Sequence, residues 1–215
     1  MKLIPSSDQI DAIILDFGGV LYDIDYPAPA RAFEALGMKH FEAIYSKASQ
    51  TDLFDRLETG NISNGDFLEA LHKYVPSGIT KQQVLAAWNS ILIGIPKRRI
   101  DFVHQLSGNH RMFLLSNTNA IHVAEFEKDI EKEMGLDYFR AAFEKVHYSN
   151  VLGIKKPYPE TYLHVCKLHG LNPQRTLFVD DSPQHVRGAI DAGLFGYHLE
   201  LPQEDISIAL ASLAI

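Results

Sequence analysis

Four short apolar runs, each followed by polar residues or turn-formers, constrain the fold of this chain more than any other feature. They lie at 10–15, 112–115, 145–148 and 177–179. Such runs are typical of strands that are buried on both faces of a parallel sheet. Stretches with helical spacing of apolar residues alternate with them, at 96–108, 159–170 and 183–193. Because strands that alternate with helices indicate right-handed crossover units, we predict an α/β fold with a doubly wound, mostly parallel, Rossmann-like sheet.

The segment at 23–95 interrupts this alternation. It lacks strand signals, whereas Ser63 and Thr80 each begin a pattern typical of a helix N-terminus, with an acidic or amide residue three positions later. A helical insertion between the first and second core strands is the simplest interpretation. We therefore predict a core domain formed by residues 1–22 and 96–215, and a helical-bundle cap domain formed by residues 23–95.

The composition narrows the class of function. A formal net charge of −7 over 215 residues argues against a protein that wraps nucleic acid, because such affinity comes largely from Lys and Arg side chains that neutralise phosphates. No apolar run approaches the length needed to span a bilayer. The single cysteine, Cys166, fits a reducing compartment. We expect a soluble, unprocessed, cytoplasmic protein, monomeric or homodimeric, without nucleic-acid or membrane partners.

Four motifs place charged and polar residues directly after the predicted strands. In chain order they are IILDFGGVL around Asp16, FLLSNTN around Ser116, GIKKPYPETY around Lys156, and LFVDDSP around Asp180 and Asp181. The carboxyl ends of parallel strands meet at one edge of a sheet, which is where ligands bind. Together, these motifs in this order resemble those of the haloacid dehalogenase superfamily. The predicted helical insertion lies where the members with an α-helical cap carry their lid.

The resemblance implies a phosphatase that acts on a small phosphorylated metabolite and uses Asp16 as the nucleophile, which would form an aspartyl-phosphate. Lys156, which Pro157 holds in extended geometry, would neutralise the nucleophile and the phosphoryl oxygens. Ser116 and Asn117 would hydrogen-bond a non-bridging oxygen. The expected catalytic residues are Asp16, Lys156 and Ser116. The expected substrate-binding residues are Ser116, Asn117, Gly18, Gly19, Lys156 and Arg56.

The resemblance also implies a Mg²⁺ site. Adjacent carboxylates such as Asp180 and Asp181 raise each other's pKa unless a cation intervenes. Mg²⁺ prefers oxygen ligands and commonly binds through one or two carboxylates together with substrate phosphate. Asp181 would be the more certain ligand, and Asp180 a ligand or a partner of one. Asp16 and the backbone carbonyl of Gly18 would complete the protein's share.

Gly18 departs from the pattern of the superfamily's phosphatases, which usually carry a second Asp two residues after the nucleophile. That Asp protonates the leaving group and later activates water, so a general acid–base worth about 10² to 10⁴ in rate is missing here. The first hypothesis is an ester whose leaving group needs little protonation, with a sugar 1-phosphate as the favoured example, because the chain resembles the branch with a DxG first motif. Asp23, Asp25 or His185 would be other proton sources.

Two further hypotheses stay open. A hydrolase that acts at carbon, like the superfamily's dehalogenases, would also lack this Asp, but those enzymes need no metal. The retention of Asp180 and Asp181 speaks against it, because unpaired acids would repel an anionic substrate. The third hypothesis is a pseudoenzyme that binds a phosphorylated ligand or a partner protein without turnover.

Substrate selection is expected in the cap at 23–95, because a lid that closes over the site contacts the leaving group. Arg56 would clamp a second anionic group or sugar hydroxyls, or else form a solvent-exposed salt bridge. We interpret Trp88 as part of the helical core. Nine histidines show no spacing typical of metal ligands, and we interpret them as structural. They are His40, His72, His104, His110, His122, His147, His164, His169 and His198.

Overall fold

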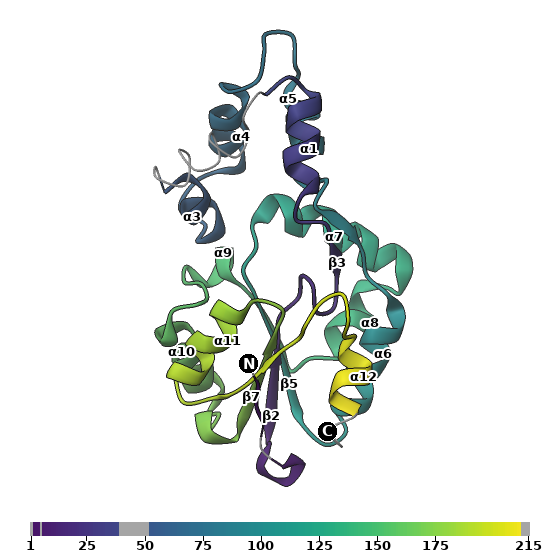
Figure 1. Cartoon of the computed structure of the whole chain (residues 1–215), viewed down its shortest axis with the longest axis vertical. Helices are drawn as coiled ribbons and strands as arrows, with labels where there is room; N and C mark the ends of the chain where they lie inside the picture. The colour runs from purple at the N-terminus through teal and green to yellow at the C-terminus, as the bar shows by residue number, and fades with distance from the viewer. Residues whose placement is uncertain (1, 5, 39–51, 212–215) are drawn as a thin grey trace.

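A six-stranded sheet forms the centre of the computed structural model, which describes residues 2–4, 6–38 and 52–211 (Figure 1). Its strands are β1 (Lys2–Leu3), β2 (Ala12–Leu15), β5 (Arg111–Ser116), β6 (Lys145–Tyr148), β7 (Thr176–Asp180) and β8 (Phe195–His198). They lie in the order β1, β8, β7, β2, β5, β6, and only β1 is antiparallel to its neighbour. The chain adds β5 and β6 on one side of β2 and then β7 and β8 on the other. The prediction of a doubly wound, mostly parallel sheet is confirmed.

Helices cover both faces of the sheet. One face packs against α6 (Lys97–Leu106), α7 (Ala120–Glu133), α8 (Leu136–Ala141) and α12 (Ile206–Ala211), and the other against α10 (Pro159–His169) and α11 (Pro183–Asp191). Successive strand residues point to opposite faces. Ile13 therefore belongs to the first apolar cluster and Ile14 to the second. Short helical turns lie at Ser7–Gln9, α9 (Ser149–Leu152) and Pro173–Arg175.

The sequence runs predicted β2, β5, β6 and β7 but not β8. In β8, Gly196 and His198 interrupt the apolar pattern, so that no run stands out. Gly196 lies against Val186 and Ile190 of α11, where a Cβ atom would be only 2.9 Å and 2.8 Å from their side chains. The strand therefore depends on close packing between the helix and the sheet, which periodicity does not reveal.

A second body of helices lies at the top of Figure 1. It consists of α1 (Ala28–Ala35), α3 (Leu53–Glu58), α4 (Asn64–His72) and α5 (Lys81–Asn89). These helices have an apolar cluster of their own, in which Phe33, Phe67 and Val84 are fully buried. Ser63 and Thr80 cap α4 and α5 by accepting the backbone N–H three residues later, as predicted. The remainder of the inserted segment, at 39–51 and with His40 in it, lies outside the described residues.

Two short antiparallel strands, β3 (Asp23–Ile24) and β4 (Leu92–Gly94), join the helical body to the sheet. The expectation that 23–95 contains no strand was therefore wrong at its two ends. Both strands are too short for a period of two to emerge from the sequence. They pair at the place where the chain leaves the sheet after β2 and returns to it before α6.

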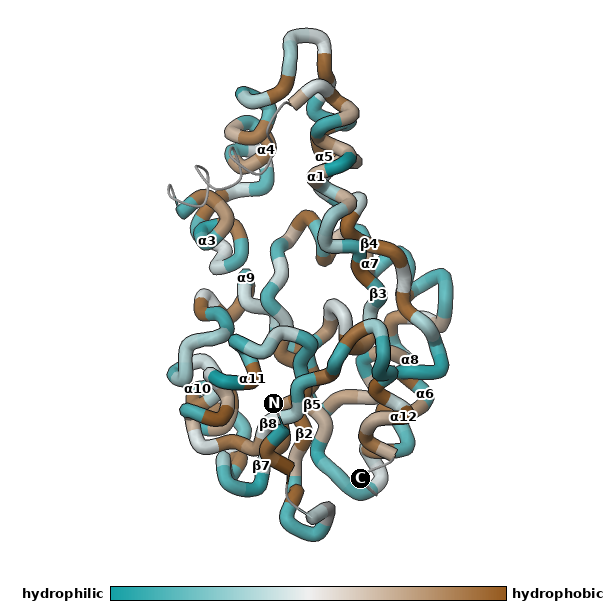
Figure 2. Tube along the Cα trace, viewed as in Figure 1, coloured by the Kyte–Doolittle hydropathy of each residue, from teal (hydrophilic) through white to brown (hydrophobic). Residues whose placement is uncertain are grey.

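The helices of both bodies carry hydrophobic residues in alternation with hydrophilic ones, as Figure 2 shows along α4 and α10. This pattern is typical of helices that bury one face against a core. None of the helices in the described parts of the chain is long and apolar enough to cross a membrane.

Candidate active site

Asp16, Ser116 and Asp180 lie together at one edge of the sheet. Asp16 follows β2 directly, whereas Ser116 and Asp180 end β5 and β7, the strands on either side of β2. The backbone N–H of Asp16 donates to the carbonyl of Val179 at 2.9 Å, which fixes the start of the turn relative to β7. Parallel pairing thus brings three distant parts of the sequence to one place.

Lys156 connects two of these residues. Its Nζ lies 2.7 Å from Asp16 Oδ1 and 2.6 Å from Asp180 Oδ2, and its side chain is fully buried. Asn117 fixes the lysine backbone: Asn117 Nδ2 donates to the carbonyl of Lys156 at 2.9 Å, and the N–H of Lys156 donates to Asn117 Oδ1 at 3.0 Å. Because the side chain of Asn117 is engaged in this way, its predicted contact with phosphate would use the backbone N–H.

Asp180 is also completely buried, and its carboxylate has several other partners. His185 Nδ1 lies 3.1 Å and 3.0 Å from its two oxygens, and Oδ1 accepts the backbone N–H of Ser182 at 2.7 Å. Together with Lys156, these contacts use both oxygens. Asp180 therefore holds Lys156 and the start of α11 in place.

Asp181 faces the turn that follows Asp16. Its Oδ2 accepts a hydrogen bond from the hydroxyl of Tyr26 at 3.1 Å. Its carboxylate lies so close to Gly19 that a Cβ atom there would overlap it. Gly19 also has a φ of +77°, a conformation that side chains disfavour. The absence of a side chain at Gly19 thus lets Asp181 approach the turn that carries Asp16 and Gly18.

The site holds an excess of negative charge. Among the described residues, Lys156 is the only lysine or arginine paired with Asp16, Asp180 or Asp181. Burial, and then the charge of Asp180, raise the pKa of Asp16 well above its usual range. Burial raises the pKa of Asp180 as well, but Lys156 and His185 outweigh this effect and lower it to about 2. Burial lowers the pKa of Lys156, but its two carboxylate partners raise it further than burial lowers it.

This imbalance of charge fits a divalent cation. Asp16, Asp180 and His185 offer ligand atoms that lie within 4.8 Å of one another. Because the oxygens of Asp180 already have partners, Asp16 and Asp181 are better able to supply carboxylate ligands. Carboxylate oxygens suit Mg²⁺, and a cation beside Asp16 would favour its ionised form. The donor set is therefore one that magnesium can use.

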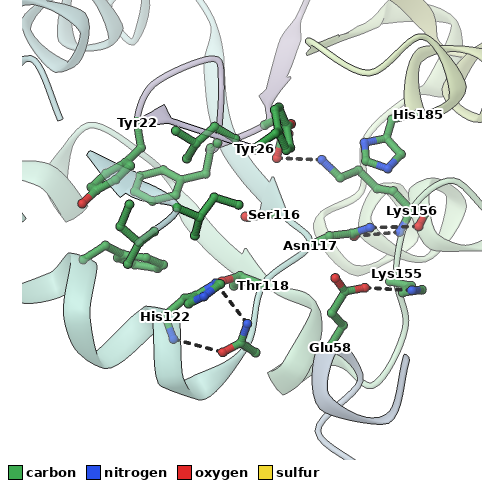
Figure 3. Close-up of a pocket in the computed structure, with 18 of the residues that line it drawn as sticks. Tyr22, Tyr26, Glu58, Ser116, Asn117, Thr118, His122, Lys155, Lys156 and His185 are labelled. Carbon is green, nitrogen blue, oxygen red and sulfur yellow. Dashed lines mark hydrogen bonds and ion pairs between the residues drawn. The ribbon is translucent and has the colours of Figure 1, made fainter. Parts of the chain in front are cut away.

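A cavity of about 490 Å³ opens beside these groups, between the edge of the sheet and helices α3 and α5 (Figure 3). The predicted site residues that line it are Asp16, Gly18, Ser116, Asn117 and Lys156. Gly19 and Asp181 line a neighbouring cavity on the other side of the turn. Arg56 lines neither: it is exposed, and its Nη2 lies 3.4 Å from the carbonyl of Asn61. The structure does not bring Arg56 to the site.

Several residues that were not predicted as site residues also line the cavity. Glu58 of α3 pairs with Lys155, whose Nζ lies 2.8 Å from Glu58 Oε2, and Asp55 pairs with the same lysine. Trp88, interpreted as core, packs against the apolar cluster of the second helical body but lines the cavity too, as does His122. Asp55 and Glu58 lie three positions apart on a helix whose apolar residues are buried. That spacing indicates that the two acids share one face of the helix, but it does not indicate which part of the protein this face meets.

The alternative proton sources are distributed unevenly. Asp23 Oδ1 accepts from Arg99 Nη1 at 2.7 Å, and Asp25 pairs with Arg31. Neither acid lines the cavity beside Asp16. His185 does line it, but its Nδ1 faces Asp180. Of these three candidates, His185 alone reaches the cavity.

The sequence matches a known family and a characterised relative. Residues 10–193 match the family model of haloacid dehalogenase-like hydrolases. The chain is 31% identical over 183 residues to D-ribitol-5-phosphate phosphatase of Bacteroides thetaiotaomicron, covering 83% of this chain and 86% of that protein.

Solved structures share the overall fold. A haloacid dehalogenase family enzyme from Bacteroides thetaiotaomicron, in complex with magnesium and inorganic phosphate, superposes with a TM-score of 0.81 and 29% identity over 93% of this chain and 98% of that one. A predicted hydrolase of this family from Porphyromonas gingivalis gives a TM-score of 0.80 and 31% identity over 96% and 98% of the two chains. The order of the motifs, the fold and the family match lead to one conclusion: the chain belongs to the haloacid dehalogenase-like hydrolases.

Proposed function

We propose that this chain is a magnesium-dependent phosphatase that hydrolyses a small phosphate monoester through an aspartyl-phosphate on Asp16. The observation that carries the proposal is the position of Lys156, whose ammonium contacts Asp16 and Asp180 beside a cavity of about 490 Å³. Phosphoryl transfer needs a nucleophile, charge neutralisation and positioning, and a cavity of this size suits a small metabolite. One relative is named as a sugar-alcohol phosphatase, and another binds magnesium and phosphate.

In the proposed reaction, a carboxylate oxygen of Asp16 attacks phosphorus in line and the bond between phosphorus and the leaving oxygen breaks. Water then hydrolyses the aspartyl-phosphate, which releases phosphate and restores Asp16. Lys156 neutralises charge on the transferred group, while the Ser116 hydroxyl donates to a non-bridging oxygen. Mg²⁺ held by Asp16, Asp181 and the carbonyl of Gly18, with Asp180 as a further ligand or a partner of one, would offset the charge of the phosphate.

Gly18 favours a leaving group that departs without strong protonation. A Cβ atom at this position would lie 3.1 Å from Ile24 Cδ1, so that the space where the usual acid would project is bordered by an apolar side chain. The anomeric oxygen of a sugar 1-phosphate is a weaker base than an ordinary alkoxide, which supports that substrate class. The relative named for D-ribitol 5-phosphate supports an ester of a primary alcohol instead. The shared proposal is a sugar or sugar-alcohol monophosphate.

We propose further that residues 23–95 act as a cap over a core formed by residues 1–22 and 96–215. Ion pairs of Asp55 and Glu58 with Lys155 hold α3 of the cap to the core, and Gly60, just after α3, packs against the backbone carbonyl of Asn150. A cap in this position would exclude water and contact the leaving group.

A screen of the purified protein with Mg²⁺ tests the proposal. The panel would contain sugar 1-phosphates, sugar 6-phosphates, D-ribitol 5-phosphate, nucleotides and p-nitrophenyl phosphate, with Asp16→Asn as the inactive control. Turnover that requires Mg²⁺ and is lost in Asp16→Asn is expected. Preference for 1-phosphates would support the leaving-group argument, and preference for terminal phosphates would count against it.

Two other results would identify the alternatives. Binding of a phosphate ester without any product after long incubation would indicate a pseudoenzyme, which the missing acid at Gly18 favours. Halide release from a haloacid that is indifferent to EDTA would indicate hydrolysis at carbon. Either result would refute the proposed phosphatase.

A further inference from the structure

One end of the cavity is built from helix α3 and the loop before α10 together. Glu58 and Asp55 reach it from α3, and Lys155 reaches it from the loop that also carries Lys156. Figure 3 shows Glu58 beside Lys155, on the side of the cavity opposite Tyr26. Lys155 is largely buried, with 18% of its side chain exposed, and one of the two oxygens of Glu58 is bonded to it. The two carboxylates face one ammonium, so this end carries net negative charge.

His122, a titratable group that also lines the cavity, does not compensate for that charge. Burial lowers its pKa to about 4, so the ring is neutral near pH 7. Its hydrogen bonds agree: Asn119 Oδ1 accepts the backbone N–H groups of Ile121 and His122, which leaves Asn119 Nδ2 to donate to His122 Nδ1 at 3.1 Å. The proton of the imidazole therefore lies on Nε2, which faces the carbonyl of Trp88 at 3.4 Å.

The rings of His122 and Trp88 form a flat part of the wall of the same cavity. They stack with their centroids 5.1 Å apart and an angle of 18° between their planes, and both line the cavity. A flat apolar wall beside carboxylate oxygens suits the C–H face and the hydroxyls of a sugar or sugar alcohol. It offers no positive charge to a second phosphate or to a carboxylate.

We infer that Glu58, held by Lys155, is a specificity-determining residue that accepts a hydrogen bond from a hydroxyl of an uncharged leaving group and rejects leaving groups that carry a second anionic group. The inference rests on the proposed phosphatase activity and deepens it. Lys155 uses Glu58 Oε2, and Oε1 is the oxygen that would receive the hydroxyl. A hydrogen bond to a charged acceptor is typically worth about 10- to 100-fold in affinity.

The experiment compares wild type with Glu58→Gln, and uses Glu69→Gln as the matched control. Glu69 is an exposed carboxylate of the same cap that pairs with Lys81 and does not line the cavity. The probes are α-D-glucose 1-phosphate and α-D-glucose 1,6-bisphosphate, which differ only in the second phosphate. For each we would measure KM or, for a poor substrate, the inhibition constant against turnover of p-nitrophenyl phosphate. The latter has no hydroxyl and reports on the phosphate end alone.

Wild type is expected to bind the monophosphate at least about 10-fold more tightly than the bisphosphate. Glu58→Gln should weaken binding of the monophosphate about 10-fold relative to p-nitrophenyl phosphate, and it should narrow the difference in affinity between the monophosphate and the bisphosphate. Glu69→Gln should resemble wild type in every value. If wild type binds both probes equally well, or if Glu58→Gln weakens all three ligands alike, Glu58 does not select the leaving group. Equal binding of both probes by wild type can be measured without any variant. Absence of turnover with every ester would instead overturn the phosphatase proposal itself.

Discussion

Gly19→Ala tests whether Asp181 belongs to a metal site, because the two residues share one small space. A methyl group at Gly19 would overlap the Asp181 carboxylate, which must then turn away from Asp16. The carboxylate is the end of a flexible side chain, so the overlap itself adds little to the cost of folding. The φ of +77° at Gly19 adds strain of about 1–2 kcal/mol for alanine. We therefore expect modest destabilisation together with a loss of Mg²⁺ affinity of about 10- to 100-fold.

Gly170→Ala separates the two effects. Gly170 has a similar conformation, with a φ of +62°, but a Cβ atom there would meet nothing within 4 Å. Urea unfolding of both variants should give a similar decrease in the free energy of unfolding. Isothermal titration with Mg²⁺ should show weaker binding for Gly19→Ala alone. Equal Mg²⁺ affinity in wild type and in both variants would refute the assignment of Asp181 to the metal site.

Three further predictions concern substitutions of Asp16, Asp180 and Gly18. Asp16→Asn should reduce turnover by at least about 10³-fold. The raised pKa of Asp16 favours the folded state only at low pH, and this stability is lost as the pH rises through that pKa. The same variant should therefore have a higher urea midpoint than wild type at neutral pH in EDTA. Asp180→Asn should lower the free energy of unfolding by about 2 kcal/mol above pH 4, because the pKa of Asp180 is lowered from 3.8 to about 2 in the folded state. The difference from wild type should fade as the pH falls towards 2. Urea unfolding across this pH range would show a constant difference if the ion pair with Lys156 were unimportant. Gly18→Asp should accelerate the hydrolysis of alkyl phosphates by about 10-fold or more once Ile24 shifts. The hydrolysis of p-nitrophenyl phosphate, whose leaving group needs no proton, should change little. Equal acceleration of both esters in steady-state assays would show that proton transfer is not the cause.

Local patterns in the sequence predicted four strands of the central sheet and the acidic edge of that sheet. Buried parallel strands need near-continuous apolar runs, and the runs at β2, β5, β6 and β7 predicted those strands. The carboxyl ends of parallel strands share an edge, and the positions of Asp16, Ser116 and Asp180 followed from that rule. These inferences rest on local patterns and on a general rule of topology, and neither depends on how distant elements pack.

The contact between α3 and the loop before α10 could not be predicted from the sequence. Lys155 and Glu58 are distant in sequence, and their pairing depends on the packing of α3 against the loop before α10. Packing also placed Trp88 partly at the cavity and left Arg56 in solvent, because helical periodicity gives a buried face without saying which neighbour covers it. Likewise, the closeness of Asp181 to Gly19 depends on a contact between two turns. Such distances are set by how whole elements pack, and a one-dimensional pattern carries no information about them.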